Sequence, residues 1–159
     1  MIAQAVETDP SLLHLLGGMT FADAYAIDVE DQGLPAESAA QRVFLQPPRW
    51  ITLLMRWRDR IVTLIGLKGV KDNDRPEIDA IGGFPVVLRT PERLILGFDD
   101  WHLDFRIVID ALHSPSGGTR IRTTTLVAPH NLLGRLYLAI VLPFHRRIVP
   151  AMLNTVRLS

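Results

Sequence analysis

Residues 76–128 carry turn signals at short and regular intervals. The apolar segments between them have no room for the helical crossover that a pair of parallel strands needs. This spacing therefore predicts an antiparallel meander and excludes a parallel sheet for this part of the chain. The signals are Gly82-Gly83, Thr90-Pro91-Glu92, Asp99-Asp100 and the run from Ser114 to Gly118.

The segments before the meander predict one strand and several helices. FADAYAIDVE (21–30) alternates apolar residues with small or acidic ones, which is typical of a half-buried strand. A short helix is expected at 9–18, with Asp9 as its N-cap. AESAAQRVFLQ (36–46) and PRWITLLMRWRDRIVTLIGL (48–67) follow as two helices, and the second has one broad apolar face. The polar stretch GVKDNDRPE (69–77) predicts a surface loop.

The last long segment predicts a helix from about Asn131, its N-cap, to Arg157. Apolar residues surround nearly its whole circumference, so we expect it to be buried on most of its surface. Pro143 and Pro150 lie on one face and should make the helix curve. Its longest uninterrupted apolar run, 136–144, is far shorter than the ~20 residues of a membrane span. A helix lying at a membrane surface, with Arg146-Arg147 at the headgroups, is the alternative.

Together these elements predict an α+β fold in a single domain covering residues 1–159. A curved antiparallel sheet would wrap around the long C-terminal helix, with two helices inserted after the first strand. This arrangement buries every apolar face at once.

The order of these elements resembles the helix-grip fold of the START-like and SRPBCC superfamily. Several stretches are similar to the uncharacterised domain-of-unknown-function family 2867 within it. They are FADAY, FLQPPRWITLLMRWRDRIVTLIGLKG, GFDDWHLDFR, TTTLVAPHNLLGRLYL and PFHRRIVP. The resemblance implies a cavity between the sheet and the C-terminal helix, which relatives use for lipids, polyketides or other apolar molecules. It implies no catalytic residues.

Composition narrows the classes of partner. Seventeen basic residues balance seventeen acidic ones, so no overall positive field attracts nucleic acid. The absence of cysteine excludes disulfides, thiolate zinc sites and a cysteine nucleophile. The first residues lack the pattern of a signal peptide. We therefore expect a cytoplasmic protein with no integral membrane segment, no cofactor and no metal; a homodimer is left open.

The run GFDDWHLDFRIVID (97–110) predicts two strands joined by a turn at Asp99-Asp100. A two-residue turn would set Phe98 opposite Trp101 and Leu96 opposite Leu103, with the apolar residues of both strands on one face. A slip of one residue would pair apolar with polar positions. Because Asp-Asp is a weaker turn pair than Asn-Gly, a longer loop is the alternative.

This register places His102 and Asp104 two positions apart on the other face. They could form a metal site or an acid–base pair. We favour a solvated ladder on the convex face, in which Asp110 and arginines such as Arg122 form cross-strand pairs.

The inward positions give the candidate ligand-binding residues. Threonine hydroxyls on an apolar face either bond locally or contact a ligand. Asp23 either reaches water at a sheet edge or serves a cavity, and His145 is either a core histidine or a catalytic one. The arginines around Trp57 either form a solvated face or reach an anionic group of a ligand. The candidates are Asp23, Tyr25, Trp57, Trp101, Leu103, Phe105, Thr123, Thr125, Tyr137 and His145.

Three functions are compatible with these features. The leading one is a binder or carrier of a small apolar or amphipathic molecule in the cavity. The second is a cyclase- or dehydratase-type enzyme with Asp23 or His145 as acid–base groups, flanked by Tyr25 or Tyr137. The third is an interaction module for a reductase-like partner, by analogy with relatives fused to such a domain.

Overall fold

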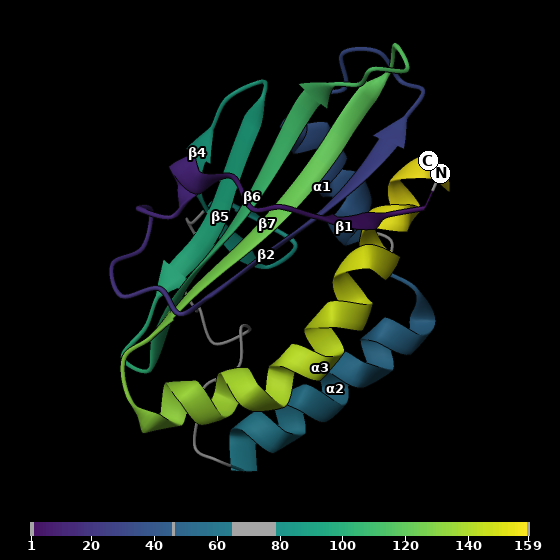
Figure 1. Ribbon diagram of the computed structural model, residues 1–159. Coiled ribbons are helices and arrows are strands. Elements are labelled where there is room, and N and C mark those ends of the chain that lie inside the picture. The colour runs from purple at the N-terminus through teal and green to yellow at the C-terminus, as the bar shows by residue number, and fades with distance from the viewer. Residues whose placement is uncertain (1, 46, 65–78, 159) are drawn as a thin grey trace.

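The computed structural model describes residues 2–45, 47–64 and 79–158. Within them lies a seven-stranded antiparallel sheet of order β1-β2-β7-β6-β5-β4-β3 (Figure 1). Two helices follow β2 and one long helix follows β7. The strands are β1 (Gln4–Val6), β2 (Phe21–Val29), β3 (Ala80–Ile81), β4 (Phe84–Arg89), β5 (Arg93–Asp99), β6 (Leu103–His113) and β7 (Thr119–Pro129). The helices are η1 (Pro10–Leu12), α1 (Ala36–Leu45), α2 (Arg49–Leu64), α3 (Leu132–Thr155) and η3 (Val156–Leu158).

The predicted α+β class, the meander and the long C-terminal helix are confirmed. The helix expected at 9–18 is a single turn, η1, capped by Asp9, whose carboxylate accepts a hydrogen bond from the Ser11 amide. The edge strand β1 was not predicted, because three exposed residues carry no periodic signal. The residues from 65 to 78, which include the end of the predicted helix 48–67 and the loop GVKDNDRPE, lie outside the described residues.

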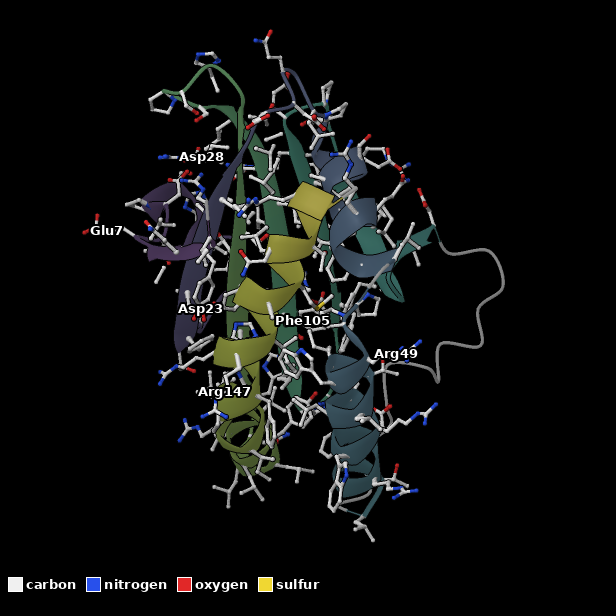
Figure 2. The ribbon with its side chains drawn as sticks, turned by 90° about the vertical axis from the view of Figure 1, so that its right-hand side faces the viewer. Glu7, Asp23, Asp28, Arg49, Phe105 and Arg147 are labelled. Atoms are coloured by element: carbon white, nitrogen blue, oxygen red, sulfur yellow. The ribbon has the colours of Figure 1, made fainter. Side chains whose placement is uncertain are left out.

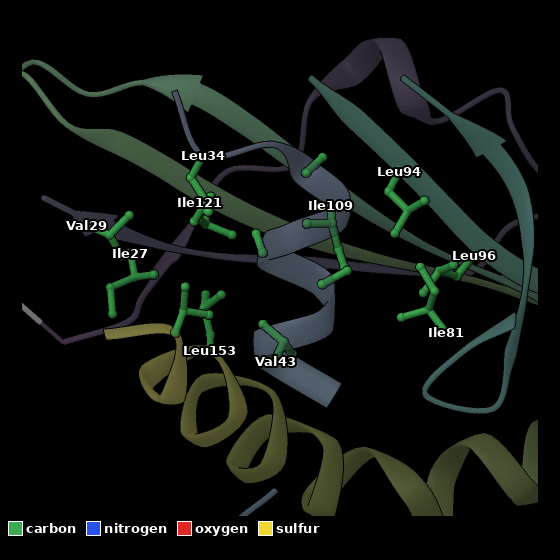
Figure 3. Packing of buried hydrophobic residues seen from close by; sticks show 14 residues of the cluster. Ile27, Val29, Leu34, Val43, Ile81, Leu94, Leu96, Ile109, Ile121 and Leu153 are labelled. Carbon is green, nitrogen blue, oxygen red and sulfur yellow. The ribbon is translucent and has the colours of Figure 1, made fainter. Parts of the chain in front are cut away.

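All three α-helices lie on one side of the sheet, which we call the inner face, while the N-terminal segment crosses the other side (Figure 1). A cluster of fourteen buried apolar residues fills one end of the inner face. It joins α1 to the sheet and to the last turns of α3 through Leu153 (Figure 3). Burial of each large side chain such as Ile109, Ile121 or Leu153 contributes ~2 kcal/mol. This end of the fold is therefore a packed core.

The outer face is not the solvated ladder that we predicted. Its centre holds a second apolar cluster, in which Leu12 and Leu16 of the N-terminal segment cover Val108 and Leu126. Beside it Asp110 is only 1% exposed. The expected cross-strand pairing of Asp110 does form, with Arg93 at 2.5 Å and Arg122 at 2.7 Å. The N-terminal segment thus turns a polar strand face into a buried ion-pair network.

The predicted turn at Asp99-Asp100 is wrong in register but right in its faces. Asp99 still pairs with Asp104, so the loop between β5 and β6 spans 100–102. Phe98 pairs with Phe105 instead of Trp101. Because the shift is an even number of residues, the main apolar rows of both strands, which include Leu96, Phe98 and Phe105, stay on the inner face. Hydrophobic alternation determines the face, whereas the turn sequence was too weak to determine the pairing.

Helix α3 begins at the predicted N-cap, where the Asn131 side chain accepts a hydrogen bond from the Gly134 amide at 3.0 Å. The helix contains Pro143 and Pro150 and curves along its length, as expected (Figure 1). The prediction that most of its surface is buried is wrong, since its buried residues are Gly134 and Leu153. The sheet covers one side of α3, and its apolar circumference extends onto the exposed side.

Candidate functional site

The part of the inner face that adjoins the fourteen-residue core cluster, on the side of Tyr25, has a different chemical character. Its side chains come from adjacent positions of β2, β7 and β6, in the register Asp23↔Thr125 and Tyr25↔Thr123. We call this area the polar end of the inner face. Its members are Phe21, Asp23, Tyr25, Phe105, Thr123 and Thr125.

Asp23 meets His145 across the space between β2 and α3. The Asp23 carboxylate oxygens lie 3.0 and 3.1 Å from His145 Nε2, and both side chains are largely buried. The Phe21 ring packs edge-on against the imidazole, with ring centroids 5.8 Å apart. The carboxylate therefore orients the histidine, and the aromatic ring restricts its movement. Two of the predicted candidates form a pair that is suited to binding a polar group or moving a proton.

Tyr25 lies two positions after Asp23 on the same face of β2. Burial of the phenol raises the pKa of Tyr25, and the nearby Asp23 carboxylate adds to that rise, while Arg146 of α3 opposes it. The hydroxyl is thus kept protonated and can donate a hydrogen bond.

Thr123 and Thr125 are both buried on this face. The Thr123 hydroxyl has no hydrogen-bond partner among the described residues. Thr124, on the outer face of the same strand, has an unpartnered buried hydroxyl as well. A buried hydroxyl without a partner costs about 1–3 kcal/mol. On the inner face, opposite Tyr25, the Thr123 hydroxyl is available to a ligand.

Aromatic and aliphatic residues border these polar groups. Phe105 is partly buried and packs against Phe84 and Phe98, with centroid distances of 5.4 and 4.3 Å. Leu103, two positions before Phe105 on the same face of β6, is buried. Figure 2 shows Asp23 and Phe105 on strands near α3, with Arg147 on the helix itself. The polar end thus combines one apolar wall with a few polar groups, as is typical of small-molecule sites.

The favoured prediction that His102 is solvated on the outer face is wrong, and the alternative pair of His102 with Asp104 does not form either. His102 lies in the β5–β6 loop, 4% exposed, with its ring edge-on to Tyr137 at 5.7 Å. Its Nδ1 is 3.4 Å from an Asp100 oxygen, close enough for a Coulomb interaction but without hydrogen-bond geometry. Desolvation lowers the pKa of His102, although Asp100 partly opposes this effect. Asp104 instead lies 2.8 Å from His130.

Trp57 and Trp101 lie apart from the polar end. Trp57 is 63% exposed and Trp101 is 61% exposed, so neither side chain lines the space between the sheet and α3. Trp101 was placed inward because the predicted register put it in a strand, whereas it lies in the loop. Tyr137, which was predicted as a possible flanking group for Asp23 or His145, has its ring edge-on to His102 and lies eight residues before His145 on α3.

Phe21 is a residue of the site that was not among the predicted candidates. Its position two residues before Asp23, on the same face of the strand, could have indicated that it lies beside Asp23. In the described part of the chain, no group of three or more histidine and acidic side chains has an arrangement that could hold a metal ion.

The comparisons with known proteins give a family but no activity. The profile of the family described as "Protein of unknown function (DUF2867)" matches residues 15–152. A search of curated proteins found no match.

Proposed function

We propose that this chain, which belongs to the DUF2867 family, binds a small amphipathic molecule between the polar end of the inner face and α3. The observation that supports the proposal most directly is the Thr123 hydroxyl, which is buried without a partner opposite Tyr25, two positions along β7 from Thr125, the strand partner of Asp23. The helix-grip-like architecture supports the proposal, because relatives that the fold resembles use this region for apolar ligands. We place the chain within that START-like superfamily as part of the same proposal.

The chemistry of the residues defines the class of ligand. Phe105 and Leu103 offer apolar contact to the body of the molecule. Thr123 and Tyr25 can donate hydrogen bonds to an oxygen atom, and the Asp23–His145 pair can hold a hydroxyl or a carbonyl group. The expected ligand therefore has an apolar skeleton with one or two oxygen functions and no high charge.

Matched variants on the two faces of β7 test the proposal. Thr123→Val removes an unpartnered hydroxyl from the inner face, and Thr124→Val removes one from the outer face, with the same change in volume and polarity. Native mass spectrometry of protein purified from cells should show a copurified small molecule in the wild type and in Thr124→Val. Its occupancy should be lower in Thr123→Val. Equal occupancy in all three proteins, or no bound molecule in any, would contradict the proposal.

A dehydratase- or cyclase-type enzyme is the second candidate, favoured specifically by the 3.0 Å approach of Asp23 to His145. His145 would remove a proton from the substrate carbon, and Tyr25 or a water molecule would protonate the departing hydroxyl. Asp23→Asn keeps the shape of the side chain but removes the charge that orients the imidazole. If the enzyme removes water from its substrate, with or without ring closure, this variant should copurify with a molecule heavier than the wild-type one by the mass of water. An identical mass in both proteins would contradict a dehydration.

A further inference from the structure

Helix α2 exposes the apolar residues that most helices bury. Trp50, Leu53, Trp57 and Leu64 are separated by three, four and seven positions, which places them on one side of the helix. All four are exposed, and Leu64 is 87% exposed. Ile51, which is buried, points to a different side of α2. The exposed stripe is therefore not the surface by which α2 packs on the rest of the protein.

The stripe on α2 is not isolated. Helices α2 and α3 lie next to each other at the same end of the molecule, in both views (Figures 1 and 2). At the start of α3, Leu132 is exposed, and the preceding Asn131 donates a hydrogen bond to the carbonyl of exposed Trp101 at 3.1 Å. We call the exposed apolar residues of α2 and of the start of α3, taken together, the helix face. They are Trp50, Leu53, Trp57, Leu64, Trp101 and Leu132.

All three tryptophans of the protein are exposed. Trp50 and Trp57 lie on α2, and Trp101 lies in the loop that is hydrogen bonded to the start of α3. Tryptophan is the side chain most enriched at the boundary between lipid headgroups and acyl chains, because its ring is apolar and its indole N–H is polar.

The charged residues of α2 and α3 are almost all basic. Together α2 and α3 contain seven arginines and one aspartate, although the whole chain has no net charge. The arginines of α1 and the sheet are paired with carboxylates, for example Arg42 with Asp31 and Arg120 with Asp28. In contrast, Arg49, Arg56, Arg60, Arg135, Arg146 and Arg147 form no ion pair within the described part of the chain, and all six are exposed.

We propose that the helix face binds the surface of a lipid bilayer that contains anionic lipids. The tryptophan and leucine side chains would enter the headgroup boundary, and the arginines would contact lipid phosphates. A second copy of the chain is a poorer occupant, because a symmetric dimer through this face would bring the two sets of arginines together. A basic amphipathic surface rich in tryptophan is complementary to anionic lipid in both its apolar and its charged parts.

Helix α3 lies along the bilayer in this arrangement and does not cross it. It is the one helix among the described residues with the length and hydropathy of a span, and 6% of that window is buried. Its first turn is packed on the His102 backbone through Gly134, and Leu153 near its end is part of the core cluster. Both ends are therefore fixed to the sheet, while the exposed side between them is free to contact lipid. The proposal does not depend on a ligand in the interior.

Vesicle binding tests the proposal directly with the intact protein. Vesicles of phosphatidylcholine mixed with phosphatidylglycerol should sediment the protein and shift its tryptophan emission to shorter wavelength. Vesicles of phosphatidylcholine alone should bind more weakly, and added salt should weaken binding to the mixed vesicles. Trp57→Ser should reduce partitioning, whereas Val87→Ser, at an exposed apolar residue of β4, should leave it unchanged.

A matched charge control separates local from overall electrostatics. Arg56→Gln with Arg60→Gln should lower the partition coefficient for mixed vesicles by roughly tenfold or more. Gln4→Glu with Gln41→Glu changes the net charge by the same amount at exposed positions of β1 and α1, and should have a much smaller effect. Circular dichroism of each variant verifies folding. Equal losses in both double variants, or no emission shift with either kind of vesicle, would overturn the proposal. So would a dimer that Trp57→Ser dissociates in the absence of vesicle binding, because it would assign the face to a second copy.

Discussion

Asp23 and His145 are 122 positions apart in the chain, yet His145 Nε2 lies 3.0 Å from the Asp23 carboxylate. The contact ties α3 to β2 at the end of the sheet that the main core does not cover. We expect a double-mutant cycle with Asp23→Ala and His145→Ala to give a coupling of ~1 kcal/mol, since the pair is largely buried and hydrogen bonded. Urea unfolding of the four proteins measures it. The exposed pair Asp31–Arg42 serves as the reference and should couple by less than ~0.5 kcal/mol. Equal couplings would mean that the Asp23–His145 contact does not persist in solution.

Asp110 should be the most sensitive acidic residue of the outer face. It is almost fully buried between Arg93 and Arg122, and Arg122 also contacts Asp9 of the N-terminal segment at 3.2 Å. Asp110→Ala leaves two arginines without their main partner, so we expect a loss of ~3 kcal/mol in the free energy of unfolding. Asp31→Ala, at a solvent-exposed pair, should change it by less than ~1 kcal/mol. Chemical denaturation of both variants makes the comparison, and similar small losses would contradict the buried network.

Gly134 allows the first turn of α3 to approach the β5–β6 loop. A Cβ atom at this position would lie 1.9 Å from the His102 carbonyl oxygen. In an open helix, replacing glycine by alanine stabilises by ~1 kcal/mol. Here Gly134→Ala should instead destabilise by ~2 kcal/mol, because the helix must move away from the loop. Gly17→Ala, where a Cβ would meet no atom within 4 Å, is the matched control in a thermal melt. A stabilised Gly134→Ala protein would disprove the close contact.

His102 should make stability fall on mild acidification. Its pKa is lowered in the folded protein, chiefly by desolvation, so the unfolded chain takes up the proton at a higher pH than the folded one. The contribution of the neutral ring is complete above the unfolded pKa of about 6.5 and is lost as pH falls from there toward the lower folded value. Stability measured by urea unfolding between about pH 7 and 5 should decline more steeply in the wild type than in His102→Gln. Parallel curves would show that His102 is not the group responsible.

Much of the fold and part of the site could be predicted from local pattern. The Asp9 and Asn131 caps, the strand from Phe21 and the curved proline-containing helix each depend on residues close together in sequence. The faces of β5 and β6 were correct as well, because alternation has a period of two. The pairing of Phe98 was wrong, since it depends on the length of a loop that carries only a weak turn signal.

The sequence by itself determined most of the helices and strands and the inward apolar side of the long strands, because those properties arise from neighbours along the chain. Only the tertiary structure decided what each polar residue meets. It brought Asp23 to His145, buried His102 in a loop, covered Asp110 with the N-terminal segment and left Trp57 on the surface. These outcomes depend on contacts between segments far apart in the chain, and hydrophobic periodicity contains no information about which apolar face remains uncovered.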